Sequence, residues 1–104
     1  MSKPDPKSMA NKEILEVLWE EKPYLLEKFG VLSIGLFGSY AKGTERPDSD
    51  IDVLVELKEP RFELLAGFQI YLERKLGKRV EVVRKRKGLS DRFLKRIGES
   101  IQYA

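Results

Sequence analysis

Carboxylate side chains with the spacing of a metal site occur in residues 36–54. Asp50 and Asp52 are separated by a single residue, and the pair Gly38-Ser39 precedes them, with ten residues in between. Side chains in a strand alternate between the two faces, so both aspartates point to the same side, where their charges repel unless a cation or a proton neutralises them. Mg²⁺ prefers a few carboxylates together with water and substrate phosphates. The spacing therefore predicts a magnesium site.

The Gly-Ser pair supplies the other half of such a site. Glycine lets backbone N–H groups approach an anion closely. Ser39 is expected to begin a short helix over residues 40–42, and the N-terminus of a helix attracts phosphate. Two cations of the following loop, Lys42 and Arg46, are candidates for contacts with the same phosphates, although each could equally be a solvated surface charge. The stretch predicts binding of a nucleoside triphosphate and a divalent cation.

The segments FGSYAKG and PDSDIDVLV together resemble the signature of nucleotidyltransferases with the DNA polymerase beta-like fold. The chain is most similar to the minimal nucleotidyltransferase branch, small proteins that act as antitoxins beside HEPN-domain ribonuclease toxins. The resemblance extends from about Asn11 to the end of the chain. It implies a mixed sheet with an open active face and a third carboxylate at Glu81. The family commonly has Asp there, and Glu carries its carboxyl group one methylene further from the backbone.

The resemblance also implies a mechanism, in which two Mg²⁺ ions are bound by Asp50, Asp52 and Glu81. One ion would hold the triphosphate of ATP, and the other would lower the pKa of an acceptor hydroxyl for in-line attack on the α-phosphorus. Because the chain contains no histidine, Glu81 is the candidate proton acceptor.

The acceptor implied by the resemblance is a tyrosine hydroxyl of a partner HEPN toxin, which would receive AMP within a hetero-oligomer. A chain this short has no second domain to clamp a substrate, so another chain is expected to present the acceptor. Two alternatives stay open. One is an antitoxin that neutralises its toxin by occlusion alone, and the other is a small-molecule nucleotidyltransferase such as one that modifies an aminoglycoside.

Composition sets the outer bounds. With 104 residues, of which 41% are hydrophobic and 36% charged, the chain has room for one globular domain with a modest core. It contains neither cysteine nor histidine, which excludes disulfides, thiol chemistry and the commonest zinc ligand. No apolar run is long enough to span a membrane and no signal peptide is visible, so a cytoplasmic location is expected.

Positive charge is concentrated near the end of the chain. Residues 73–99 contain eleven Lys or Arg and four acids, whereas the net charge of the whole chain is +3. A basic stretch can bind nucleic acid or phosphate, but it can also be a solvated face or a surface for an acidic partner. Because no aromatic residues are interleaved as on an RNA-stacking surface, nucleic acid is not expected to be a direct substrate.

The helices that position these residues follow from apolar periodicity and from capping residues. A flexible tail over residues 1–10 is expected to precede one domain over residues 11–104. Helices are predicted over residues 11–20, over 23–29 after a break at Pro23, over 60–76, and after Ser90 as a cap.

Three apolar runs predict strands, over residues 31–37, 51–57 and 79–84. In the first strand, Leu32, Ile34 and Leu36 share the face expected to pack on helices. The order of elements predicts an α/β (α+β) fold of two layers, a small mixed sheet of about three to four strands with helices mainly on one face. Periodicity alone does not give the order of the strands.

Overall fold

The computed structural model describes residues 10–86, 89–98 and 100–104, so the predicted tail lies outside the described residues except for Ala10. No helix in these ranges combines the length and the apolar character that crossing a bilayer requires. In chain order the elements are α1 (Asn11–Phe29), β1 (Val31–Phe37), α2 (Gly38–Lys42), β2 (Ile51–Leu57), α3 (Phe62–Leu76), β3 (Val80–Arg84), α4 (Asp91–Gly98) and β4 (Gln102–Tyr103).

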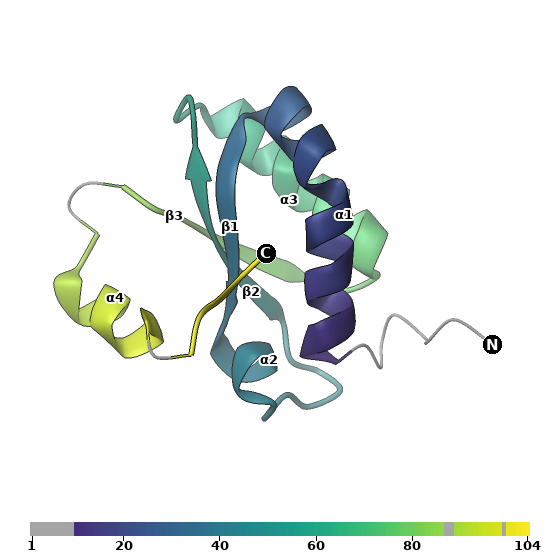
Figure 1. Ribbon diagram of the computed structural model, residues 1–104, viewed down its shortest axis with the longest axis vertical. Coiled ribbons are helices and arrows are strands. Elements are labelled where there is room, and N and C mark those ends of the chain that lie inside the picture. Colours follow the sequence, from purple (N-terminus) through teal and green to yellow (C-terminus); the bar gives the residue numbers. More distant parts are fainter. Residues whose placement is uncertain (1–9, 87–88, 99) are drawn as a thin grey trace.

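The strands form one mixed sheet in the order β3-β2-β1-β4. β1 pairs antiparallel with both β2 and β4, whereas β2 and β3 are parallel and are joined by α3, because parallel neighbours need a crossover connection. Helices α1 and α3 cover one face of the sheet, and α4 lies against the other (Figure 1). The predicted fold, a small mixed sheet with helices mainly on one face, is confirmed.

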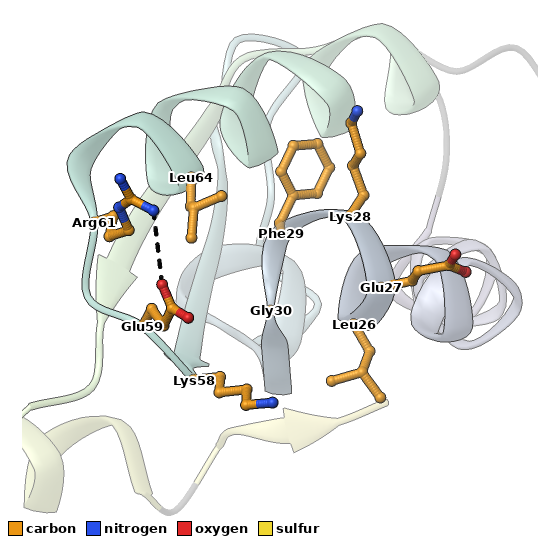
Figure 2. Close-up of a pocket in the computed structure, with 9 residues that line it drawn as sticks. All are labelled: Leu26, Glu27, Lys28, Phe29, Gly30, Lys58, Glu59, Arg61 and Leu64. Carbon is orange, nitrogen blue, oxygen red and sulfur yellow. Dashed lines mark ion pairs between the residues drawn. The ribbon is translucent and has the colours of Figure 1, made fainter.

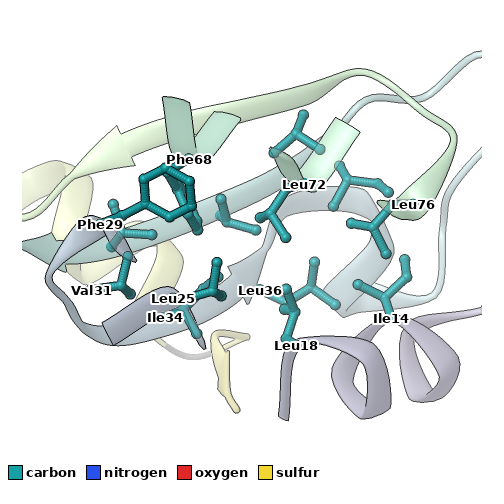
Figure 3. Close-up of a cluster of buried hydrophobic side chains, with 14 of the residues drawn as sticks. Ile14, Leu18, Leu25, Phe29, Val31, Ile34, Leu36, Phe68, Leu72 and Leu76 are labelled. Atoms are coloured by element: carbon teal, nitrogen blue, oxygen red, sulfur yellow. The ribbon is translucent and has the colours of Figure 1, made fainter. Parts of the chain in front are cut away.

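The alternating sequence of β2 explains why the two faces differ. Ile51, Val53 and Val55 are buried in the core beneath α1 and α3, while Leu54 belongs to a smaller cluster beneath α4. Asp52 points to the same side as Leu54, because side chains two residues apart share a face. Figure 3 shows the larger core, in which buried side chains of α1, β1 and α3 meet on one side of the sheet.

The helix α1 is continuous, and the predicted break at Pro23 is wrong. The buried positions Ile14, Leu18, Leu25 and Phe29 form one stripe that continues past the proline, which is itself exposed. A proline within a helix costs about 3 kcal/mol because it removes a hydrogen bond and crowds the preceding turn. Burial of Leu25 and Phe29 against the sheet offsets that local cost, since each fully buried side chain contributes about 1.5–3 kcal/mol.

The strand β1 has the predicted bounds but is irregular near its beginning. The register with β2 shifts between Val31 and Ser33, and Leu32 is 50% exposed instead of facing the helices. Beyond this irregularity, Ile34 and Leu36 are buried in the main core, as predicted. A bulge changes which residues share a face, and simple alternation in the sequence does not reveal it.

The end of the chain differs from the prediction as well. The helix predicted after Ser90 ends at Gly98, so Ile101 lies beyond it. The short strand β4 follows and pairs antiparallel with β1. A strand of two residues has too little sequence pattern to be predicted from alternation, because alternation needs at least four residues to be recognised.

Candidate active site

The Gly-Ser pair forms the beginning of α2, directly after β1. Phe37 occupies the N-cap position, and Gly38 and Ser39 are the first two residues of the helix. The helix therefore begins earlier than the residues 40–42 expected from the sequence. Gly38 has a φ of 75°, a left-handed conformation that glycine adopts without a steric penalty. This turn redirects the chain from the sheet into α2.

Gly38 lies directly against Asp52. A Cβ atom placed on Gly38 would overlap the Oδ2 atom of the Asp52 carboxylate. The cause is the antiparallel register of β1 and β2, in which Phe37, the residue before the glycine, is the partner of Asp52. The structure thus brings together the two halves of the motif that the sequence places ten residues apart.

Glu81 lies beside Asp52 on the opposite side, because the two residues are register partners in the parallel pair β2–β3. Burial raises the pKa of Asp52 to about 7, together with its hydrogen bond to the Glu81 carboxyl group and the negative charges of Glu81 and Asp50. Without a cation, Asp52 therefore holds a proton through part of the neutral range. This is the behaviour of crowded carboxylates that have no positive charge to separate them.

Asp50 lies just before β2, where it borders a polar cavity of about 320 Å³. Glu81 borders the same cavity, so the cavity adjoins the carboxylate group of the motif. Its other walls come from α3 and the start of β3, at Gln69, Glu73, Arg79 and Val80. The Gln69 amide donates to the Val80 carbonyl at 2.8 Å, and the Val80 N–H donates to the Glu73 carboxylate at 3.0 Å. Helix α3 thereby fixes the start of the strand that carries Glu81.

The donor set fits a hard divalent cation, although not as the full predicted cluster. Among the described residues, no group of three or more Asp, Glu, His or Cys side chains is arranged to hold one ion. As placed, Glu81 therefore does not complete a three-carboxylate cluster with Asp50 and Asp52. Oxygen donors and mutual crowding are the conditions under which Mg²⁺ binds together with substrate phosphates. The two aspartates fit that requirement best.

The two predicted loop cations are both exposed. Lys42 ends α2, and Arg46 lies in the loop that follows. The backbone N–H of Arg46 donates to the Ser49 hydroxyl at 2.8 Å, and the backbone N–H of Ser49 donates to the Arg46 carbonyl at 2.9 Å. These two hydrogen bonds close a turn. No ion pair holds either cationic side chain in the part of the chain that the structure describes. Their contact with phosphate stays a prediction.

Lys78 contacts the loop between the two halves of the motif, and the sequence does not single it out. Its ammonium group donates to the Pro47 carbonyl at 2.7 Å and lies 5.6 Å from the centroid of the Tyr40 ring. Tyr40 belongs to α2 and is only 2% exposed. Lys78 therefore ties the loop between α2 and β2 to the buried side of α2. In the sequence it is one of eleven cations between residues 73 and 99, and nothing distinguishes it from the others.

A second hollow, of about 300 Å³, lies at the other end of the sheet, where α1 and β2 end (Figure 2). Glu59 and Arg61 beside it form an ion pair at 3.8 Å, and both side chains are largely exposed. Charges of both signs line this hollow, and none of the predicted site residues borders it. The chemistry of the motif therefore places the candidate active site at the Asp50–Asp52 end of the sheet.

Comparison with curated proteins identifies the family of the chain. Residues 20–103 match the nucleotidyltransferase domain family. The chain is 45% identical over 74 residues to the protein adenylyltransferase MntA of Thermococcus cleftensis, which covers 70% of this chain and 75% of that protein. It is 39% identical over 94 residues to a Methanocaldococcus jannaschii protein that carries a provisional protein adenylyltransferase name, which covers 88% of this chain and 94% of the relative.

Solved structures give the same answer for the fold. A structure described as a minimal nucleotidyltransferase has a TM-score of 0.73 and 31% identity, over 91% of this chain and 96% of that chain. A toxin–antitoxin complex with AMP-PNP has a TM-score of 0.64 and 23% identity, over 81% and 69% of the two chains, and it shares the fold. The residues matched by the family and the identities to its relatives point to the same family as the motif, whose two halves meet at the Gly38–Asp52 contact. The chain belongs to the nucleotidyltransferase domain family.

Proposed function

We propose that this protein transfers AMP from ATP to a tyrosine hydroxyl of a HEPN-domain toxin and so acts as an antitoxin. The contact between Gly38 and Asp52 carries the proposal, because it joins a turn suited to phosphate with carboxylates suited to a cation. The name of the Thermococcus relative supports the transferred group. A chain with the same fold occurs in a solved complex of an AMPylated Shewanella oneidensis HEPN toxin with MNT antitoxin. That complex supports a HEPN toxin as the class of protein that accepts AMP.

In the proposed reaction, Asp50 and Asp52 would hold two Mg²⁺ ions, which supply neutralisation of the triphosphate charge and activation of the acceptor hydroxyl. Gly38 and Ser39, the first two residues of α2, would direct backbone N–H groups toward that triphosphate. Asp52 has to release its proton before it can bind a cation, since a protonated carboxyl group is a poor ligand.

Glu81 is the proposed proton acceptor for the acceptor hydroxyl. Glu81 is exposed and is the register partner of Asp52, so it borders both the carboxylates and solvent. The acceptor oxygen would form a bond to the α-phosphorus, the bond from that phosphorus to pyrophosphate would break, and the hydroxyl proton would pass to Glu81. Most of the rate enhancement would come from positioning and charge neutralisation.

The proposal is tested by whether inactivation of the toxin outlasts contact with this protein. A HEPN toxin encoded in the same genome is incubated with this protein, ATP and Mg²⁺, and the protein is then removed by an affinity tag. The ribonuclease activity of the separated toxin is measured. We expect lasting loss of activity with the parent protein, and no lasting loss when a chelator removes Mg²⁺.

Asp50→Asn and Asp52→Asn should also fail to inactivate the toxin durably, because each removes a metal ligand. Asp48→Asn is the matched control, since Asp48 is exposed in the turn of the same loop and should be dispensable. A toxin that regains full activity after separation from the parent protein would favour occlusion instead. The same conclusion would follow if the Asn variants protected as well as the parent.

A further inference from the structure

Five exposed cations lie on α4 and in the segment directly after β3, and α4 projects from the face of the sheet opposite α1 and α3 (Figure 1). Three belong to α4 itself and share one side of the helix, because residues three and four apart are neighbours on a helix surface. The other two precede the helix in the segment after β3. We call this set the basic face, and its members are Lys85, Arg86, Arg92, Lys95 and Arg96.

The opposite side of α4 is occupied by packing against the sheet. Phe93 and Ile97 join Phe37 and Leu54 in the smaller hydrophobic cluster. The rings of Phe37 and Phe93 meet edge to face with centroids 5.9 Å apart. None of the exposed large apolar side chains found in the described residues lies between residues 85 and 98. The outward surface of α4 is therefore charged and carries no apolar centre.

The charges of the basic face are not neutralised within the described protein. The two ion pairs found among the described residues join Arg61 to Glu59 and Lys75 to Glu21, and neither involves the basic face. Asp91 is the one acid among the described residues from 85 to 98. The guanidinium group of Arg96 lies 5.8 Å from the centroid of the Phe93 ring, which anchors it at the edge of the buried cluster. A concentration of like charge of this kind attracts an anionic ligand.

We propose that the basic face binds the phosphate backbone of a nucleic acid, without reading its bases. Specific protein partners usually require an apolar or aromatic centre in the interface, and the basic face offers none. Interfaces with nucleic acid are more polar and strongly positive, and the contacts to phosphate carry no sequence information. The nucleic acid is a ligand in this proposal and not the acceptor of AMP.

The helix α4, which carries three cations of the basic face, packs on the side of the sheet to which Asp52 points. Phe93 of α4 contacts Phe37, which precedes Gly38 and is the register partner of Asp52. A nucleic acid on the basic face would therefore be bound on the outward side of the helix that packs on the carboxylate-bearing face of the sheet. The inference rests on charge and packing at α4 and stands whether or not AMP is transferred.

The test is the salt dependence of binding to labelled oligouridylate and to oligothymidylate of the same length, measured by fluorescence anisotropy. For a single strand, the logarithm of the binding constant falls by about 0.7 per phosphate contact for each tenfold rise in salt, so five contacts give a slope of about −3.5. The affinity should accordingly fall roughly 100-fold between about 50 and about 200 mM salt. Equal binding of the two strands identifies phosphate as the ligand, while preference for RNA adds a contact to the 2′-hydroxyl.

Substitution of Arg92, Lys95 and Arg96 by Gln should reduce the slope by about 2 and weaken binding at low salt at least tenfold. The matched control removes the same number of charges from the helices on the opposite face of the sheet. In it, three exposed cations of α1 and α3 are replaced by Gln: Lys12, Lys28 and Arg74. The control should bind RNA like the parent. All six positions are exposed, and circular dichroism establishes that both variants are folded.

Three results would overturn the inference. The parent protein could fail to bind either strand at low salt. The control could weaken binding as much as the α4 variant, which would assign the effect to net charge alone. Finally, the α4 variant could keep its affinity for RNA while losing its affinity for the HEPN toxin, and the basic face would then belong to an interface with an acidic protein surface.

Discussion

Gly38 and Asp52 are packed so closely that no side chain fits between the backbone of the glycine and the carboxylate of the aspartate. The contact follows from the register of β1 and β2, and it sets the distance between the beginning of α2 and the carboxylates. A phosphate bound at one and a cation bound at the other would therefore be neighbours. The proposed nucleotide site depends on this contact.

The first prediction distinguishes the effect of the Gly38–Asp52 contact from the effect of the left-handed backbone conformation of Gly38. Gly38 and Gly43 have nearly equal φ angles, 75° and 73°, but a Cβ atom on Gly43 would meet nothing within 4 Å. Gly43→Ala should lower the free energy of unfolding by about 1–2 kcal/mol, because alanine would have to adopt a left-handed conformation, and Gly38→Ala should lower it by at least as much. Gly38→Ala should in addition displace Asp52 and lower the affinity for Mg²⁺–ATP at least tenfold more than Gly43→Ala does. Urea unfolding and calorimetric titration measure the two effects, and equal affinities in the two variants would contradict the account.

The motif could be predicted from the sequence because its parts are local. Two short apolar runs indicate the strands. Because side chains alternate between the two faces of a strand, Asp50 and Asp52 are expected to point to the same side. That Gly38 touches Asp52 depends on the strand register, and the pairing of Glu81 with Asp52 depends on the strand order. Periodicity provides neither, and only the resemblance to a known family connected Glu81 with the site.

The features that the sequence does not predict depend on contacts between distant segments. Pro23 is tolerated within α1 because Leu25 and Phe29 are buried beyond it. Leu32 is exposed because of an irregularity in the pairing with β2. The role of Lys78 depends on Pro47, which is 31 residues away in the chain. Local propensity is a weak guide wherever tertiary burial or a long-range hydrogen bond determines the outcome.

A second prediction concerns stability and pH in the absence of metal. The pKa of Asp52 is raised from its ordinary value of 3.8 to about 7, chiefly by burial, so the folded state binds this proton more tightly than the unfolded state. The contribution of Asp52 to stability is therefore complete below about pH 4 and is lost as the pH rises through about 7. Urea unfolding with a chelator should show a larger loss of stability between about pH 5 and 8 in the parent than in Asp52→Asn. Identical pH dependence in the two proteins would contradict the raised pKa.

A third prediction concerns the contact between α1 and α3. The Tyr71 hydroxyl donates to Glu21 at 2.7 Å, and Lys75 forms an ion pair with the same carboxylate at 3.1 Å. The hydrogen bond from Tyr71 is the largest cause of the lowered pKa of Glu21. Tyr71→Phe should lower the free energy of unfolding by about 1 kcal/mol. Tyr24→Phe is the control. It removes only a hydroxyl group from a residue that is 43% exposed and keeps the ring that lies 4.9 Å from the Tyr71 ring. It should change the free energy of unfolding by less than about 0.5 kcal/mol. Equal losses in the two variants would exclude a special role for the Tyr71–Glu21 bond.

A fourth prediction assigns Lys78 a positioning role. Lys78→Met should lower the free energy of unfolding by no more than about 2 kcal/mol, because it removes one hydrogen bond at an exposed loop and one contact with the Tyr40 ring. It should nevertheless weaken Mg²⁺–ATP binding severalfold, because the loop that leads to Asp50 loses its tie to α2. Lys58→Met removes the same charge at the hollow on the far end of the sheet and should bind ATP like the parent. Unchanged ATP affinity in Lys78→Met would show that the hydrogen bond to Pro47 does not serve the site.

The most direct test of the central claim is the intact mass of the HEPN toxin after incubation with this protein, ATP and Mg²⁺. Attack on the α-phosphorus with loss of pyrophosphate predicts a gain of about 329 Da for each AMP group, whereas transfer of the γ-phosphoryl group would add about 80 Da. Asp48→Asn should produce the same gain as the parent, and Asp52→Asn should produce none. An unchanged toxin mass, together with full protection by Asp52→Asn, would contradict the account.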